Sequence, residues 1–141
     1  MTAEARAANI AAEVAKARAA LHAADELFAI ELFDDAMSRL YYAAFHLASA
    51  ALLAVDVEAT THRGLLSLVS LHLVKPARVP PDTARGLTEL FSLRNQADYD
   101  RHFVMDADGA ADYRRRAANV LAALDGVVTA CGHEGLAATG R

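Results

Sequence analysis

The chain has 141 residues and a mass of 15.0 kDa, which is enough for one domain with its own hydrophobic core and too little for two comfortable ones. Its formal net charge of -4 and isoelectric point of about 5.8 exclude a generally basic surface, so any contact with nucleic acid must be local. The single cysteine, Cys131, excludes an intramolecular disulfide and a cysteine-based zinc site.

The hydropathy of the chain bears on its cellular location. Hydrophobic residues make up 55% of the chain, but alanine supplies much of that fraction, and the mean hydropathy is only +0.16. The longest apolar stretch, residues 43–55, is interrupted by His46 and Ser49 and is shorter than the roughly 20 residues that span a bilayer. The first residues lack the basic flank and apolar run of a signal peptide. We therefore expect a cytoplasmic protein that does not contact a membrane.

The first half of the chain predicts two long helices. Over residues 2–32, apolar side chains recur at spacings of three, four or seven, which is typical of one core-facing stripe. The second helix is predicted over residues 35–55, with Asp34 and Asp35 as its capping signal. Because that segment is apolar on nearly every side, we expect it at the centre of a bundle. The predicted stripe of the first helix consists of Ile10, Val14, Leu21, Phe28 and Leu32.

The second half of the chain predicts one short helix and two longer ones. The short helix covers residues 63–73, where Thr60 and Thr61 supply a cap. Three prolines then enforce a break, and the next helix opens at position 81 or 82 and runs into the segment of residues 93–103. The last helix is predicted over residues 110–129, because aspartates at positions 106 and 108 suit its start.

No strand pattern competes with these helices, since alternation of β-branched residues never lasts more than a few positions. The predicted fold class is therefore all-α. Short connections favour an up-and-down bundle of four long helices with one short extra helix. We assign residues 1–131 to this bundle and residues 132–141, which are small and polar, to a flexible tail.

Arg94 and Asp98 stand one helical turn apart near the end of the fourth predicted helix, so their side chains lie on the same face. If exposed, they form an ion pair worth roughly 0.2–0.5 kcal/mol. If buried, Asp98 orients the planar guanidinium, which can then bind a phosphate with two hydrogen bonds. In RNA cleavage without a metal, such an arginine would stabilise the phosphorane charge while a histidine moves the proton of the 2′-hydroxyl.

Tyr99, Arg101 and His102 follow where the helical pattern fails. His102 is the histidine nearest to Arg94 in sequence, but on a continued helix it lies two turns away and about 80° around. Cooperation therefore requires a break near Tyr99 or a second subunit. Tyr99 is a weak base at neutral pH, and the alternative role is packing on the bundle with its hydroxyl hydrogen-bonded. Arg101 adds a positive charge for binding.

A polar stripe follows the second predicted helix at spacings of three, four and three. Buried polar groups need partners. The stripe therefore either finds carboxylates and carbonyls inside the bundle or faces the Arg94 motif and completes a pocket. Both alternatives can hold together. The stripe consists of Arg39, Tyr42, His46 and Ser49.

The remaining histidines fall into two groups. His62 and Arg63 open the short predicted helix, where free backbone N–H groups favour an anion, although a helix cap followed by a solvated basic turn would look the same. His22, His72 and His133 show no spacing that would bring metal ligands together. We therefore predict no metal site and no other cofactor.

Three segments together resemble the HEPN domains, specifically the UPF0332 branch: SRLYYAAFH at residues 38–46, THRG at residues 61–64 and LRNQADY at residues 93–99. The resemblance runs in order from about residue 32 to residue 124. It implies a bundle of four or five helices, often a homodimer whose paired active sites meet at the interface. Many members look like metal-independent ribonucleases that act as toxins and are neutralised by a nucleotidyltransferase encoded beside them.

The family motif is an arginine followed, after four to six residues, by a histidine. Arg94 matches that arginine, Tyr99 stands where the histidine is expected, and His102 follows after a gap of seven residues. The resemblance thus implies a member of a toxin-antitoxin or defence pair that acts with a nucleotidyltransferase and binds RNA or a nucleotide around Arg94. One alternative is an active ribonuclease that uses Arg94 and His102, oriented by Asp98. The other is a scaffold, in which Arg94 and Asp98 form a surface pair without a pocket.

Overall fold

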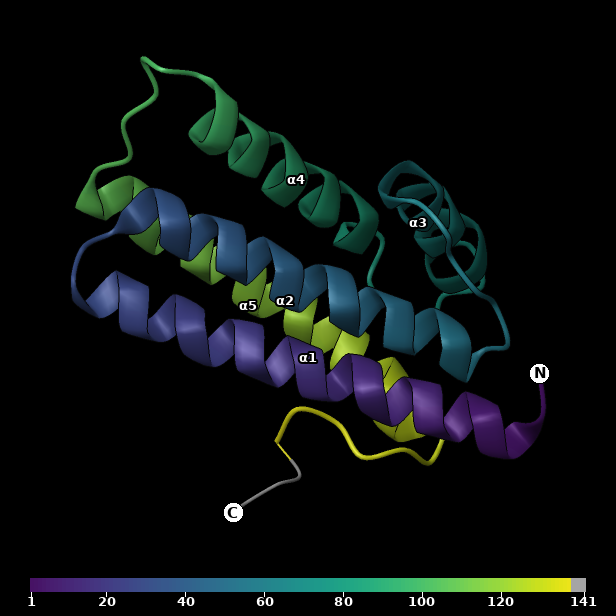
Figure 1. Ribbon diagram of the computed structural model, residues 1–141. Coiled ribbons are helices and arrows are strands. Elements are labelled where there is room, and N and C mark those ends of the chain that lie inside the picture. Colours follow the sequence, from purple (N-terminus) through teal and green to yellow (C-terminus); the bar gives the residue numbers. More distant parts are fainter. Residues whose placement is uncertain (138–141) are drawn as a thin grey trace.

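The computed structural model describes residues 1–137, which form the helical bundle of Figure 1. Over this range there is no strand, so the predicted all-α class is confirmed. A π-helical turn, η1 (Ser70–Val74), continues the short helix α3. No helix in the same range combines the length and the apolar character needed to cross a membrane. The α-helices are α1 (Ala3–Ala29), α2 (Phe33–Ala54), α3 (His62–Val69), α4 (Thr83–Tyr99) and α5 (Ala107–Ala130).

Helix α2 lies at the centre of the bundle, as its sequence predicted. It packs against α1, α3, α4 and α5. Helix α3 lies near the C-terminal end of α2 (Figure 1). Many of its buried residues are alanines, and small side chains let neighbouring helices approach closely. Larger side chains such as Met37 and Leu47 are fully buried between them. A helix in this position can carry side chains toward several neighbours at once.

The turn between α1 and α2 differs from the prediction. Helix α1 ends at Ala29, and Glu31 adopts a positive φ of 62°, which ends the helix and redirects the chain. Leu32 is therefore 48% exposed, so its predicted place in the core stripe is wrong. Leu32 is also the N-cap of α2, and Asp34 and Asp35 stand inside the first turn instead of capping it, where a carboxylate still interacts favourably with the helix dipole.

Two predicted caps are confirmed. Thr61 Oγ1 accepts a hydrogen bond from the Gly64 backbone N–H at 2.9 Å and starts α3. Asp106 Oδ1 accepts one from the Gly109 N–H at 2.8 Å and starts α5 at Ala107, three residues earlier than predicted. The position of His62, directly after the Thr61 cap, is therefore set by a local hydrogen bond.

Tyr113 joins α5 to the helix that carries the Arg94 motif. Its hydroxyl donates to the Leu90 carbonyl oxygen at 2.9 Å, and the Met37 carbonyl oxygen lies at 3.4 Å. Burial raises the pKa of this phenol well above its usual value, so the hydroxyl keeps its proton. The hydrogen bond positions α4 against both α5 and α2.

The segment after α5 lies along the bundle. The Leu136 backbone N–H donates to Asp125 Oδ1 at 2.8 Å, and Arg18 Nε donates to the Leu136 carbonyl oxygen at 3.0 Å. These contacts hold residues 132–137, the first part of the predicted flexible tail, against α1 and α5. Residues 138–141 of that predicted tail lie outside the described residues.

The central position of α2 predicts a large cost for truncating Leu47. We expect Leu47→Ala to lower the free energy of unfolding by about 2–5 kcal/mol, because the vacated volume lies in a packed interior. Urea denaturation followed by circular dichroism measures this loss. Leu71 is 53% exposed and is the matched control, for which the alanine variant should differ by less than about 0.5 kcal/mol. Equal losses in the two variants would contradict the central packing of α2.

Candidate functional site

Arg94 is a charged side chain inside the bundle. It lies on α4 with 8% of its side chain exposed, and its Nη1 donates to Asp98 Oδ2 at 3.3 Å. Its Nε is buried and finds no hydrogen-bond partner within residues 1–137. An unpaired buried donor is costly, so this guanidinium can still donate to an anion. The scaffold alternative predicted that Arg94 and Asp98 form a pair on the surface. This prediction is wrong, because Arg94 is buried.

Three aromatic rings surround the Arg94 guanidinium. Its central carbon Cζ lies 4.9 Å from the ring centroid of Tyr41 and 5.4 Å from those of Tyr42 and Phe91. Cation–π attraction of this kind offsets part of the cost of removing the charge from water. The two tyrosines come from α2, and Phe91 lies one helical turn before Arg94 on α4. The guanidinium is thus held where α2 and α4 meet.

His62 brings an imidazole to the same aromatic rings. Its Nδ1 lies 3.0 Å from the Tyr41 hydroxyl oxygen, and its ring stacks on Phe45 with centroids 4.3 Å apart. The Phe91 ring lies 6.0 Å from that of His62. Tyr41 and Phe91 therefore lie beside both the Arg94 guanidinium and the His62 imidazole. We call the following residues the Arg94 cluster: Tyr41, Tyr42, Phe45, His62, Phe91 and Arg94.

Burial and charge determine the protonation states in the Arg94 cluster. Burial, followed by the positive charge of Arg94 and then by His46, lowers the pKa of His62 below its usual 6.5. His62 is thus a neutral imidazole at neutral pH. Burial raises the pKa of Tyr41 to about 12, although the charge of Arg94 acts in the opposite direction. The Tyr41 hydroxyl therefore keeps its proton and remains a neutral hydrogen-bonding group beside His62.

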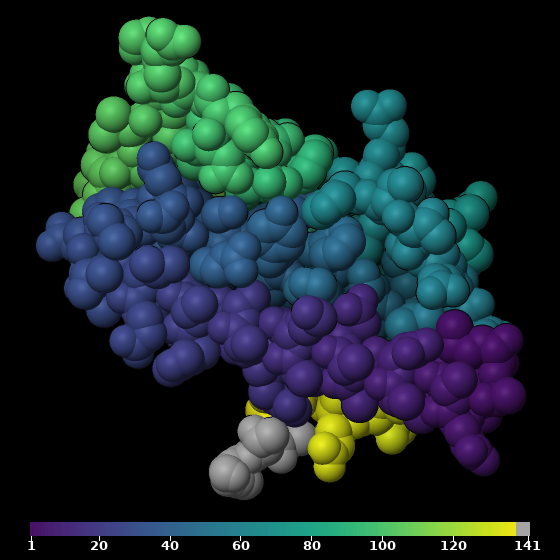
Figure 2. Space-filling view, in the orientation of Figure 1, coloured from purple at the N-terminus to yellow at the C-terminus, as the bar shows by residue number. Residues whose placement is uncertain are grey.

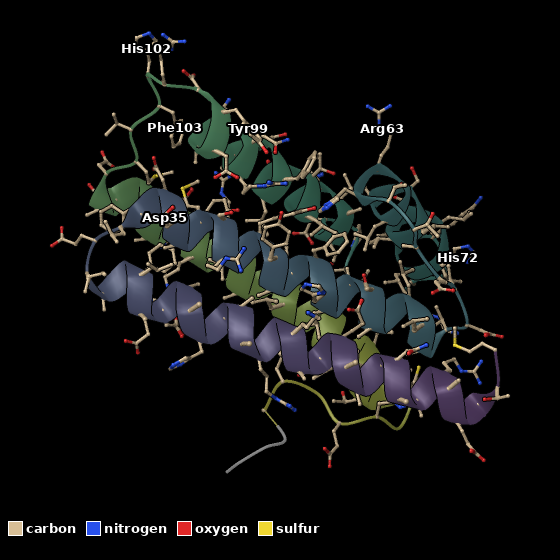
Figure 3. The ribbon with its side chains drawn as sticks, in the orientation of Figure 1. Asp35, Arg63, His72, Tyr99, His102 and Phe103 are labelled. Carbon is tan, nitrogen blue, oxygen red and sulfur yellow. The ribbon has the colours of Figure 1, made fainter. Side chains whose placement is uncertain are left out.

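An acidic cavity lies beside the cluster, between the α1–α2 turn and the α4–α5 loop. This hollow is open to solvent and has a volume of about 520 Å³, and Asp98 is part of its wall. Burial, followed by the charges of Asp35 and Asp98, raises the pKa of Asp34 above its usual value. Figure 3 shows Asp35 and Phe103 at this end of the bundle. We call this hollow the acidic cavity; its carboxylates are Glu31, Asp34, Asp35 and Asp98, and its apolar lining includes Leu32, Phe103 and Val104.

Comparison with known proteins assigns the chain to a family. The model of the HEPN domain matches residues 12–127, a range that contains the whole Arg94 cluster. The chain belongs to the HEPN domain family. The resemblance to its UPF0332 branch is confirmed by a UPF0332 protein of Gloeobacter violaceus, which is 39% identical over 84 residues, or 60% of this chain and 67% of that protein.

Two further relatives bear on this HEPN chain. A UPF0332 protein of Thermotoga maritima is 28% identical over 113 residues, which cover 80% of this chain and 86% of that protein. A protein of Methanocaldococcus jannaschii whose name describes it, provisionally, as a toxin is 30% identical over 87 residues, or 62% of this chain. The match spans 59% of that relative's length. The name of that relative describes that protein, and what the comparisons show for this chain is membership of the HEPN domain family.

The HEPN motif of this chain does not bring Arg94 and His102 together within one subunit. Helix α4 ends at Tyr99, so the predicted break exists, but the chain then turns outward. His102 is exposed at the tip of the α4–α5 loop (Figure 3), whereas Arg94 is buried. Arg101 is exposed beside it. Tyr99 is 79% exposed, so its predicted packing on the bundle is wrong.

The polar stripe of α2 divides between two neighbours. His46 Nδ1 lies 3.1 Å from Glu13 Oε1 of α1, which is the internal carboxylate partner that one alternative predicted. Tyr42 faces Arg94, as the other alternative predicted, and Arg39 Cζ lies 4.9 Å from the Tyr42 ring centroid. The stripe therefore contributes one ring to the Arg94 cluster and one histidine to the contact between α1 and α2.

His62 and Arg63 separate at the start of α3. His62 turns into the Arg94 cluster, whereas Arg63 is exposed and projects away from the bundle in Figure 3. The Thr61 side chain accepts the Gly64 N–H at this helix start, so the predicted cap is present. Of this pair, only His62 belongs to the cluster.

Sequence reasoning missed three rings of the cluster. Tyr41, Phe45 and Phe91 were not predicted as site residues. A signal existed, because Phe45 follows Tyr41 at a spacing of four and Phe91 precedes Arg94 by three, which places each pair on one helix face. Apolar spacing of this kind is usual in a helical core, so it did not point to a site by itself.

The charge of Arg94 should be measurable in the titration of His62. We expect Arg94→Met, which keeps most of the length and removes the charge, to raise the pKa of His62 toward 6.5. NMR titration of the imidazole measures this shift. Arg85, which is exposed on the same helix, is the control, and Arg85→Met should leave the value unchanged.

The same lowered pKa has a consequence for stability. Because the unfolded chain binds the His62 proton at a higher pH than the folded chain does, His62 reduces stability as the pH falls below about 6.5.

A His62 pKa that does not move in Arg94→Met would contradict the electrostatic coupling of these two residues.

Proposed function

We propose that this HEPN protein is the toxin-like member of a toxin-antitoxin or defence pair, and that it binds RNA or a nucleotide through Arg94, with a nucleotidyltransferase as its partner. The observation that supports binding is the unpaired Nε of a guanidinium that is almost completely buried. A phosphate offers two oxygens in the geometry that a guanidinium recognises, and it would satisfy this donor.

The surroundings of Arg94 favour RNA as the ligand. Tyr42, Phe45 and Phe91 are half-buried, so their rings reach the surface beside the guanidinium. Bases of single-stranded nucleic acid stack on such rings, with a contribution of about 1–3 kcal/mol per base. Arg39 and Arg63 are exposed on the helices that carry the cluster and add local positive charge to an acidic chain. These features agree with the requirement that any nucleic-acid contact be local.

A different surface favours a protein partner. The acidic cavity would repel RNA, but its rim carries the exposed apolar residues Leu32 and Val104, which are 48% and 85% exposed. Tyr99, which is 79% exposed, ends the helix beside it. Figure 2 shows the α4–α5 loop (green) standing above the surface of α2 (blue) at this end. Exposed aromatic and aliphatic side chains around a charged hollow are typical of protein interfaces.

The proposal includes a homodimer, as the family resemblance implies. His102 at the exposed loop tip could approach Arg94 only if it came from a second subunit. Analytical ultracentrifugation of the purified protein would establish the subunit number.

Binding at Arg94 can be tested with a labelled single-stranded RNA. We expect Arg94→Lys, which keeps the charge but loses the planar fork, to weaken binding by roughly 10- to 100-fold, because charged hydrogen bonds contribute about 1.5–3 kcal/mol. Fluorescence anisotropy in EDTA measures the Kd. Arg85→Lys on the exposed face of α4 should bind as the wild type does. A wild type with no affinity for RNA, and no thermal shift with nucleotides, would refute the proposed binding.

The partner surface can be tested by co-purification with the proposed partner, a nucleotidyltransferase expressed together with this protein. We expect Leu32→Ser to reduce the amount of partner recovered at least about tenfold, since a buried apolar anchor contributes 1.4 kcal/mol or more at an interface. Leu71 is similarly exposed, at 53%, but lies on the short helical segment at the other end of the bundle. Leu71→Ser should therefore leave recovery unchanged. Equal recovery with both variants would exclude the acidic cavity as the docking surface.

A further inference from the structure

We infer that His62 is the proton-transfer residue of an RNA-cleaving centre in which Arg94 binds the phosphate. The imidazole that the HEPN motif places after its arginine on one helix would here be supplied by the start of α3, which packs against α2 and α4. This inference rests on the proposed binding of RNA at Arg94 and adds a residue and a reaction to it.

Shared neighbours place the two groups in one site. The Tyr41 ring lies 4.9 Å from the Arg94 guanidinium carbon and its hydroxyl lies 3.0 Å from His62 Nδ1. Phe91 likewise lies 5.4 Å from that carbon and 6.0 Å from the His62 ring. Both groups are therefore within reach of one phosphodiester and its flanking ribose. The Tyr99 and His102 side chains, by contrast, are exposed outside this cluster.

The contacts of His62 orient its second ring nitrogen for chemistry. Phe45 holds the plane of the ring by stacking at 4.3 Å, and Tyr41 occupies Nδ1. No residue in the described part of the chain hydrogen-bonds to Nε2. When the Tyr41 oxygen accepts the Nδ1 proton, Nε2 carries the free lone pair of a general base. Tyr41 is then a positioning residue, since it acts through His62.

The charged and titratable groups around His62 keep it in the basic form. Tyr41, Tyr42 and His46 face it from α2, and Arg94 faces it from α4. Burial and the charge of Arg94 lower the pKa of His62, so the imidazole is neutral at pH 7 and can accept a proton. The imidazolium formed next to Arg94 is correspondingly acidic, which favours return of the proton to the leaving group.

The reaction is transesterification within the RNA chain. His62 Nε2 takes the proton of the ribose 2′-hydroxyl as that oxygen forms a bond to phosphorus, and Arg94 stabilises the negative charge that develops on the phosphoryl oxygens. The bond between phosphorus and the 5′-oxygen of the next nucleotide breaks, and the imidazolium returns its proton to that oxygen. The products are a 2′,3′-cyclic phosphate and a 5′-hydroxyl, so no metal, water or redox partner is consumed.

The test compares cleavage with binding in EDTA, using a labelled single-stranded RNA that contains all four bases. We expect wild-type protein to yield 2′,3′-cyclic phosphate ends and to leave the 2′-deoxy form of the same strand intact. His62→Gln should lower the cleavage rate by about 10²–10⁴-fold, the contribution of a general base, while the Kd for RNA changes less than about threefold. His22→Gln, at an exposed histidine on α1, should cleave as the wild type does.

Two measurements do not depend on the folding of the glutamine variant. The cleavage rate of the wild type should rise with pH through the pKa that NMR measures for His62, because only the neutral imidazole accepts the proton. Added imidazole should restore part of the cleavage to His62→Ala. A rate profile that does not follow the His62 titration would overturn the inference.

The possible outcomes separate this inference from the proposed function. If the wild type binds RNA through Arg94 but does not cleave it, or if His62→Gln cleaves at the wild-type rate, the inference is overturned and the binding proposal stands. If the wild type neither binds nor cleaves RNA, both are overturned. Loss of cleavage in His62→Gln with RNA binding retained supports both.

Discussion

The burial of the Arg94 guanidinium between α2 and α4 is the constraint on which the rest of the site depends. Removing such a charge from water costs on the order of several kcal/mol, and one ion pair with Asp98 at 3.3 Å does not satisfy all of its donors. Three aromatic rings offset part of that cost, and two of them belong to the central helix. The same charge lowers the pKa of His62, so one buried group organises both the geometry and the protonation of its neighbours.

The molecule presents two surfaces of opposite character beside each other. The Arg94 cluster combines a guanidinium with aromatic rings that reach the surface, whereas the acidic cavity gathers carboxylates and exposed apolar side chains. Asp98 belongs to both, because it accepts from Arg94 and lines the cavity. A ligand that neutralises Asp98 would thus change the electrostatic field at Arg94.

Several features of the fold were predictable because they are local. Helical spacing places the apolar stripe of α1 and the apolar centre of α2, and a side-chain oxygen three residues before a backbone N–H predicts the caps at Thr61 and Asp106. The place of Leu32 was not predictable in this way, since one positive φ at Glu31 ends the helix and no spacing rule reveals it. The contacts of residues 132–137 with α1 were missed because they join residues more than 100 positions apart.

For the site, the sequence by itself determined the fold class, the helix faces and the pairing of Arg94 with Asp98, because a spacing of four residues on a helix is already a contact. The tertiary structure decided which histidine accompanies Arg94. In sequence His102 is eight residues away and His62 is thirty-two, yet the end of α4 sends His102 outward while the packing of α3 carries His62 to the rings around Arg94. Proximity along the chain indicates which side chains are in contact only within one helix. Between helices, the packing of their buried faces decides which side chains meet.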